Sequence, residues 1–358
     1  MHFGLSSDQK MLVDSIAGVA AEHVTLDALR GLEAGGDLEA RLREAMADLG
    51  LYGLLVPEAH GGSGLGLLDA ALAQEALGAA CAPVTSLGAM IAAPLALSLA
   101  GSPDQQAEWL PKLAAGELKV GVALTEAAHG LCGAGRGGPS VSGGKVSGEA
   151  RFVIDAADAD LFLVGAGGKL HLAPAGAGVT ASPAPTIDLS RRTAHLSFDD
   201  AAVETLPGDG LAQVVQALWV ALAADTLGAG QTMLDRAVAY AGERVQFGRK
   251  IGSFQAVKHM CAEMAADLEP CRSLVWYAAH AAAESPDEAP MMAALAGSHL
   301  AEVGRDVART ATEVHGGMGF TDLMGLHFWF KRIGWNRQAL GGPELVRGYA
   351  ARLEGLAA

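Results

Sequence analysis

The chain has 358 residues, of which 51% are hydrophobic and 18% charged, and its formal net charge is −15 at pH 7. This length predicts two or three domains with a large buried interior, and the composition excludes an intrinsically disordered chain. The negative charge disfavours nucleic acid as a ligand, because phosphates bind to basic surfaces.

The cysteines and the apolar stretches indicate the compartment. Cys81, Cys132, Cys261 and Cys271 have neither paired spacing nor a nearby histidine cluster of ligand type. We therefore expect a reducing compartment, no structural disulfide and no metal site. The first residues show no basic segment followed by an apolar one, and the apolar stretch 211–224 is shorter than a membrane span. The sequence thus predicts a cytoplasmic protein with no signal peptide and no membrane span.

Residues 5–118 carry helical periodicity. A Ser-Ser-Asp cap at residues 6–8 precedes the first apolar residues of this pattern. Between Leu38 and Leu49, apolar side chains recur on one helical face and charged side chains lie opposite. We predict an N-terminal helical domain over residues 1–118.

From about residue 119 to 208 the pattern changes to short alternating segments. Gly143 and Gly144 separate two of them and predict a two-residue hairpin turn, because glycine accepts positive φ. Further alternating pieces occur around Phe152 and Ile154, at 161–164, and at 194–198. We predict a middle β-sheet domain over residues 119–208.

Helical patterns return after residue 208. Three long runs extend from Leu211 to Glu243, from Phe254 to Ala283 and from Ala289 to His315. The first is apolar nearly all round, which predicts a position inside a bundle. The other two are apolar enough to predict an oligomer interface. We predict a C-terminal helical bundle over residues 209–358.

The loop between the first two runs carries the strongest functional pattern. It offers cations at Arg244, Arg249 and Lys250 and aromatic faces at Phe247 and Phe254. A guanidinium suits a pyrophosphate, and an aromatic wall beside it suits an adenine or a ribose. The alternative is a solvated turn between helices.

This loop resembles the signature of the acyl-CoA dehydrogenases, flavoproteins in which an Arg-x-x-Phe-Gly-x-x-Ile-x-x-Phe-Gln segment holds the adenine half of FAD. The resemblance implies FAD-binding roles for Arg244, Phe247, Gly248, Phe254 and Gln255.

Segment 49–66 resembles the Gly-hydrophobic-Pro-Glu-x-x-Gly-Gly-x-Gly element of the same family, although alone it indicates only a helix end and a turn. The family's domain order also resembles the order predicted here. The implied fold class is α+β, mainly α, with an N-terminal helical domain, a middle β domain and a C-terminal four-helix bundle.

A glycine-rich helix end follows at residues 313–319. In the family, a Gln-x-x-Gly-Gly-x-Gly element at this place contacts the adenine side of FAD from a neighbouring subunit. The resemblance implies such contacts for Glu313, Gly316 and Gly317. Glu313 replaces a neutral amide, so a cation such as Arg244 must offset its charge beside a pyrophosphate. The alternative role of Gly316 is a helix C-cap.

The residues implied to face the flavin ring depart further from the family. Thr125 and Glu126 resemble the start of a Thr-Glu-Pro-x-x-Gly-Ser-Asp loop whose threonine hydrogen-bonds the isoalloxazine, but the rest of the loop differs. Phe152 takes the aromatic position of an aromatic-Ile-Thr-Asn strand and can stack on a flavin, while Ile154 replaces the hydroxyl. The alternative for Phe152 and Ile154 is strand core.

The family's catalytic base is missing at both of its known places. Removal of an α proton needs a carboxylate, which the family supplies from a Tyr-Glu-Gly-Thr motif or from the long helix. These positions map to Leu340 and to Leu218 or Trp219. Glu344 lies close in sequence, but its mapped position is on the adenine side.

These departures imply a subunit that keeps the adenine-binding half of a shared FAD site. The leading function is FAD-dependent α,β-dehydrogenation of an acyl-CoA in a tetramer with a paralogous subunit that supplies the base. Such heteromers act on steroid side chains in this family, which implies lipid or steroid side-chain degradation, with electron-transfer flavoprotein as acceptor. The alternatives are a self-sufficient homotetramer with a relocated carboxylate and a non-catalytic helical scaffold or binding module.

Overall fold

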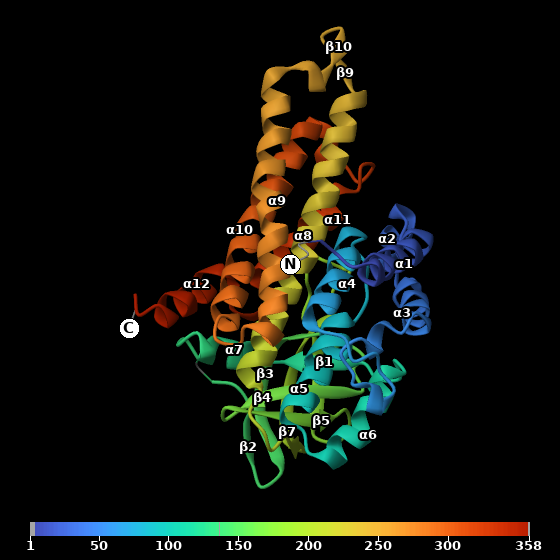
Figure 1. Cartoon of the computed structure of the whole chain (residues 1–358). Coiled ribbons are helices and arrows are strands. Elements are labelled where there is room, and N and C mark those ends of the chain that lie inside the picture. The colour runs from blue at the N-terminus through green and yellow to red at the C-terminus, as the bar shows by residue number, and fades with distance from the viewer. Residues whose placement is uncertain (1–3, 136, 357–358) are drawn as a thin grey trace.

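The computed structural model describes residues 4–135 and 137–356 (Figure 1). The sheet lies at one end, three long helices stand above it, and the N-terminal helices lie beside them (Figure 1). Strands of the large sheet fall between residues 120 and 205, which agrees with the predicted order of elements. The domain limits at residues 118 and 208 stay predictions. The first three residues, part of the segment in which no signal peptide is expected, lie outside the described ranges.

The N-terminal region is helical, as predicted. Its helices are α1 (Ser7–His23), α2 (Leu26–Gly31), α3 (Leu38–Asp48), α4 (Leu67–Ala79), α5 (Ala93–Ala100) and α6 (Pro103–Ala114), with the π-helical turn η4 (Leu87–Ala92) before α5. Ser6 caps α1 in a reciprocal pair with Gln9. Leu38 and Leu42 are buried, but Leu49 is 40% exposed because α3 ends one residue before it.

The sheet has the strand order β6-β7-β3-β1-β4-β5-β8, and β2 pairs with β3. Its strands are β1 (Val120–Ala123), β2 (Ser140–Ser142), β3 (Lys145–Ile154), β4 (Leu161–Ala166), β5 (Lys169–Pro174), β6 (Val179–Pro183), β7 (Thr193–Ala202) and β8 (Glu204–Thr205). Ser142 pairs with Lys145 around Gly143 and Gly144, which confirms the predicted hairpin. A short helix, α7 (Thr125–Leu131), interrupts the segment predicted as strands.

The C-terminal bundle consists of α8 (Leu211–Glu243), α9 (Gln255–Glu284), α10 (Ala289–His315), α11 (Leu326–Gln338) and α12 (Gly342–Leu353). The long helices begin and end within one residue of the predicted limits. By length and composition α8 could cross a membrane, contrary to the expectation from 211–224. However, 83% of its most apolar window is buried inside the protein, as in the core helix of a bundle.

A buried ionic cluster joins the bundle to the segment before β7. Asp225 on α8 accepts hydrogen bonds from Arg191 (2.6 Å), from Arg332 of α11 (3.1 Å) and from Asn336 (2.7 Å). Arg332 also donates to Asp188 (3.0 Å). Asp225 and Arg332 are both 0% exposed. The cluster therefore fixes α8, α11 and the 188–191 segment to one another.

Asp155 is a surplus carboxylate beside this cluster. Burial raises its pKa to about 6, although Arg191 opposes the shift, and the only hydrogen bond recorded for its side chain is a long one from the Gly88 amide, 3.4 Å. Two buried guanidiniums, those of Arg191 and Arg332, thus face three carboxylates, those of Asp155, Asp188 and Asp225. Ionisation of Asp155 costs stability.

Asp155→Asn should stabilise the protein at pH 7 by roughly 1–2 kcal/mol. The folded-state pKa is raised above the unfolded value, so wild-type stability falls as pH rises from about 4 to about 6 and is level above that. Asparagine accepts the positive φ of 56° at this position. Urea unfolding at pH 4 and pH 7 checks this. A stability gain of equal size at both pH values would refute the role of ionisation.

Candidate functional site

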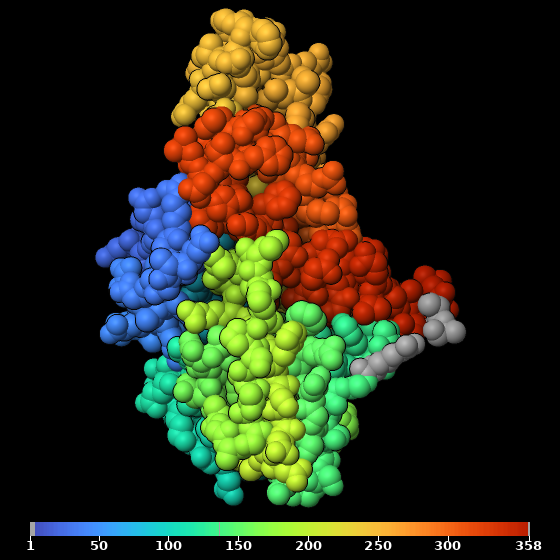
Figure 2. Space-filling view, turned by 180° about the vertical axis from the view of Figure 1, so that it is seen from behind, coloured from blue at the N-terminus to red at the C-terminus, as the bar shows by residue number. Residues whose placement is uncertain are grey.

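The loop that carries the family signature forms the tip of the molecule (Figures 1 and 2). It contains a small hairpin of β9 (Val245–Gln246) and β10 (Arg249–Lys250), whose turn has Phe247 and Gly248 at φ of 53° and 75°. Phe247 is 93% exposed and meets the Phe254 ring edge-on, with 6.1 Å between centroids. The guanidinium of Arg249 lies 3.9 Å from the centroid of the other aromatic ring, Phe254. Arg244 is exposed, and Gln255 begins α9 at the surface.

The glycine-rich end of α10 lies at the same end of the bundle. His315 stacks on Tyr240 of α8 with 4.5 Å between ring centroids, and the Arg244 amide donates to the Tyr240 carbonyl (2.8 Å). Glu313 and Gly317 are exposed next to these residues.

Gly316 ends α10 at a φ of 58°, so its C-cap role is present. The structure thus brings together the two segments predicted to hold the adenine half of FAD. They face outward at the tip, away from the ring-side residues near the sheet (Figure 1).

A cavity of about 560 Å³ lies between the sheet and the end of α11, and we call it the ring-side cavity. Thr125 and Phe152 both line it, together with Ile154 and Leu340. Phe152 is 59% exposed, which rules out a strand-core role, whereas Ile154 is 2% exposed. The Thr125 hydroxyl donates to the Phe152 carbonyl (3.4 Å), so α7 and the end of β3 are tied together at this wall.

The position mapped to the family base lies on the same wall. Leu340 is 1% exposed and sits in a bend, η7 (Ala339–Gly341), at a φ of 53°. Trp219 donates its indole N–H to the Leu340 carbonyl (3.0 Å) and thereby holds the bend. Leu218 is fully buried. Glu344 lies outside the cavity, where its exposed carboxylate accepts from Arg337 (3.3 Å).

Among the described residues that line the ring-side cavity, His129 is the one with an ionisable side chain. A Cβ added to Gly341 would lie 3.8 Å from its Cδ2 atom, so the imidazole packs against the bend that carries Leu340. Sequence reasoning missed this residue. Its spacing of four from Thr125 is the signal that could have found it once α7 was recognised as a helix, because such residues share a helical face.

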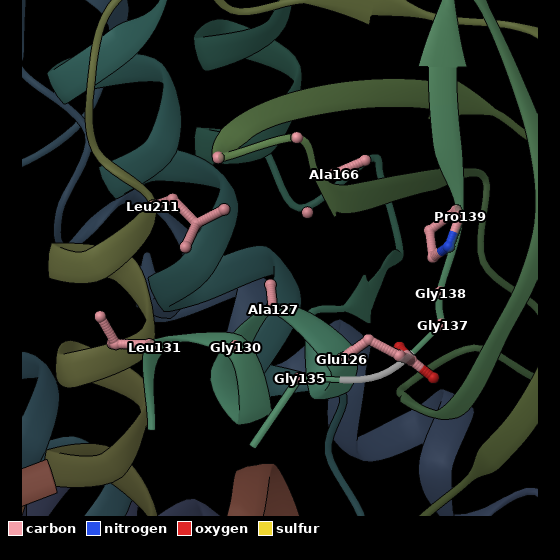
Figure 3. A pocket seen from close by; sticks show the side chains of 13 residues that line it. Glu126, Ala127, Gly130, Leu131, Gly135, Gly137, Gly138, Pro139, Ala166 and Leu211 are labelled. Atoms are coloured by element: carbon pink, nitrogen blue, oxygen red, sulfur yellow. The ribbon is translucent and has the colours of Figure 1, made fainter. Parts of the chain in front are cut away.

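A second cavity, of about 360 Å³, lies beside the first and is largely walled by glycine (Figure 3). Glycines from segment 130–138, and Gly165 to Gly168 at the turn after β4, line it with Leu211 of α8. The Glu126 carboxylate points into it (Figure 3). One carboxylate oxygen accepts from the Arg151 amide (2.8 Å), while Oε2 is buried with no hydrogen-bond partner in the described structure. We call this the glycine-walled cavity. Thr125 and Glu126 are consecutive, so the two cavities meet at the start of α7.

Within residues 4–135 and 137–356, no group of three or more His, Cys, Asp or Glu side chains could hold a metal ion. The four cysteines are free thiols, and three of them are buried. The polar chemistry of the two cavities therefore comes from Thr125, Glu126 and His129.

Comparison with known proteins identifies the family. Residues 6–117 match the acyl-CoA dehydrogenase N-terminal domain and residues 208–352 match the acyl-CoA dehydrogenase C-terminal domain. The chain is 32% identical to acyl-CoA dehydrogenase IpdE2 of Mycobacterium tuberculosis over 95% of both chains. It is 32% identical to acyl-CoA dehydrogenase FadE27 of the same organism over 92% of both.

Two solved structures are similar over nearly the whole chain. The Tcur3481-Tcur3483 steroid ACAD G363A variant has a TM-score of 0.88 and 27% identity, with 97% of this chain and 98% of that chain covered. The ChsE4-ChsE5 complex from Mycobacterium tuberculosis has a TM-score of 0.88 and 28% identity, with 99% and 98% covered. With its helical bundle, signature loop and these whole-length relatives, the chain belongs to the acyl-CoA dehydrogenase family of oxidoreductases, whose cofactor is FAD.

Proposed function

We propose that this chain is one subunit of a heteromeric acyl-CoA dehydrogenase that forms a Cα–Cβ double bond in an acyl-CoA thioester. In this complex it contributes the adenine-binding half of FAD, and a paralogous subunit supplies the base. One observation carries the proposal: the adenine-side residues project from the tip, whereas the base position in the chain's own ring-side cavity is Leu340. We include a cytoplasmic location and a tetramer in this proposal.

The residues at the tip fit the adenine half of FAD. Phe247 and Phe254 expose aromatic faces that an adenine or ribose can cover, and Arg244 presents a guanidinium to a pyrophosphate. Gly316 and Gly317 leave backbone free for close approach beside them. The exposure of Phe247 is itself an argument for a covering partner, because a bare phenylalanine at a loop tip is costly in water.

The ring-side cavity fits a flat aromatic ring but lacks the family's proton acceptor. Phe152 offers a stacking face and Thr125 a hydroxyl. FAD, when bound, supplies the acceptor for the hydride that leaves Cβ. The α proton must go to a base, and no carboxylate lines this cavity within the described residues.

Relatives support an assembly of unlike chains. The ChsE4-ChsE5 structure is a complex by its name. The relative named caffeyl-CoA reductase-Etf complex subunit CarC, from Acetobacterium woodii, is 26% identical over 88% of this chain and 89% of its own. The name of the Tcur3481-Tcur3483 structure includes a steroid. These names support a paralogous partner, electron-transfer flavoprotein as acceptor, and lipid or steroid side chains as the acyl class.

We infer that the glycine-walled cavity holds the pantetheine arm of the thioester. Its glycines admit a narrow chain, and it adjoins the ring-side cavity where the acyl carbons react. Pantetheine carries amide N–H donors, and the partnerless Oε2 of Glu126 is an acceptor for one of them.

Glu126→Ala should therefore raise the Kd for an acyl-CoA about three- to tenfold, the loss expected for one hydrogen bond. Titration of the complex by calorimetry measures it. Glu44→Ala on α3, which changes the same charge at a remote exposed position, is the matched control and should leave the Kd unchanged. Equal Kd values for wild type and Glu126→Ala would remove this role.

Co-expression tests the main proposal. The chain expressed alone should reduce no artificial electron acceptor with any acyl-CoA. Co-expressed with a paralogue, it should purify as a yellow tetramer of two kinds of subunit with half as many flavins as chains. Size-exclusion chromatography with mass determination and flavin absorbance decides between these states. A stable monomer that binds no relative, or robust turnover by the homogeneous protein, would contradict the proposal.

His129 is the observation that favours a second candidate, a self-sufficient homotetramer. Neither Glu344 nor Glu126 lines the ring-side cavity, so a relocated carboxylate has no support there. An imidazole has a pKa suited to proton transfer near neutral pH. If the homogeneous protein turned over, His129→Ala would separate the two: loss of that turnover supports the candidate, and retention excludes His129 as its base.

A further inference from the structure

A third cavity, of about 400 Å³, lies where the N-terminal helices meet the lower end of the bundle. We call it the inter-helix cavity. Residues from α4, α5, α8, α9, α10 and α12 line it, and none of them is shared with the ring-side or the glycine-walled cavity. The proposed dehydrogenation makes no use of it.

Small side chains create this space. Ala217, Ala278 and Ala293 lie at its buried part on three neighbouring helices, where larger residues would fill the gap. Leu99 is 47% exposed and, with the exposed Gln213, forms a mouth toward solvent. The cavity is thus a pocket with an apolar interior and an open side.

One polar pair marks its wall. Gln216 donates from Nε2 to the hydroxyl oxygen of Tyr349 (2.9 Å), and both side chains are 8% exposed. This is the one hydrogen bond recorded for the Tyr349 side chain in the described structure, and there the hydroxyl accepts. Its O–H therefore remains free to donate. A buried donor without an acceptor is costly, so it favours a ligand oxygen at this point.

The charge of the cavity narrows the ligand further. No Lys, Arg or His side chain is among the described residues that line it. A carboxylate or phosphate placed there would be desolvated without a counter-charge. A neutral oxygen on a hydrocarbon meets both conditions, because it accepts from Tyr349 and leaves the rest of the molecule against alanine, leucine and proline.

We propose that the inter-helix cavity binds an uncharged aliphatic molecule with a carbonyl oxygen, such as a medium-chain ketone or ester, with that oxygen accepting from Tyr349. The site does not depend on FAD or on the paralogous subunit. Its failure would therefore leave the proposed dehydrogenase function untouched.

The probes are 2-undecanone and decanoate, titrated calorimetrically into the full-length chain and into its complex. The ketone should bind saturably at one site, and decanoate at least tenfold more weakly. Tyr349→Phe removes only the hydroxyl and should weaken ketone binding about five- to tenfold. Ala282→Trp, at an exposed position on the rim, should block binding without repacking the interior.

Ile187→Trp is the matched control, because Ile187 is 69% exposed and lines the ring-side cavity instead. It should leave ketone binding unchanged. Absence of saturable ketone binding, or binding that Ile187→Trp abolishes and Ala282→Trp does not, would overturn the proposal. Thermal unfolding of each variant shows that the fold is retained.

Discussion

Replacing Arg332 by alanine should lower the free energy of unfolding by about 3–5 kcal/mol, the cost of leaving a buried carboxylate without its partner. Arg332 is 0% exposed and donates to Asp188 at 3.0 Å and to Asp225 at 3.1 Å. Burial alone would raise the pKa of Asp225, but Arg332 and Arg191 outweigh it and hold that pKa below its ordinary value. Without Arg332, the cluster keeps its carboxylates and loses half of its positive charge.

Urea unfolding of Arg332→Ala and of Arg192→Ala provides the measurement and its control. Arg192 pairs with Glu39 at 2.7 Å, but its side chain is 45% exposed, so its removal should cost at most about 1 kcal/mol. A loss below 1 kcal/mol for Arg332→Ala as well would show that the cluster does not hold the bundle against the sheet.

The same cluster stands behind the ring-side cavity. Trp335 and Gln338 of α11 line that cavity, while Arg332 and Asn336 of the same helix belong to the cluster. The 184–187 segment lines the cavity too, and Asp188 follows it directly. Two of the cavity walls therefore depend on buried ion pairs. Loosening those pairs should affect any flat ligand held there before it affects the distant tip.

The sequence was sufficient for features encoded in neighbouring residues. The limits of α8 and α10 follow from uninterrupted helical periodicity, and the turn at Gly143 and Gly144 follows from two adjacent glycines between alternating segments. The tip loop also lies in one continuous segment, so its motif could be found without knowing the fold.

Features that depend on distant residues could not be predicted in this way. Asp225 and Arg332 are 107 positions apart, and each is a single charged residue in a largely apolar run. The ring-side cavity combines the start of α7, the end of β3 and the bend at Leu340, which only the tertiary structure brings together. Phe152 looked equally suited to strand core until its 59% exposure placed it on a cavity wall.

Arg244→Ala should weaken FAD binding by the co-expressed complex by roughly 10- to 150-fold, equivalent to about 1.5–3 kcal/mol for a charge-assisted hydrogen bond. Arg244 is exposed at the tip beside Phe247 and within reach of the glycine-rich end of α10, so its charge is available to a pyrophosphate held by a neighbouring chain. Its loss would also leave the exposed Glu313 without the cation expected to offset it. The measurement is flavin absorbance per tetramer after gel filtration, followed by FAD titration of the stripped complex. Lys258→Ala, which removes the same charge from the exposed first turns of α9, should retain FAD. Unchanged flavin content in Arg244→Ala would take the pyrophosphate away from this loop, and with it the reason to regard the tip as half of a shared site.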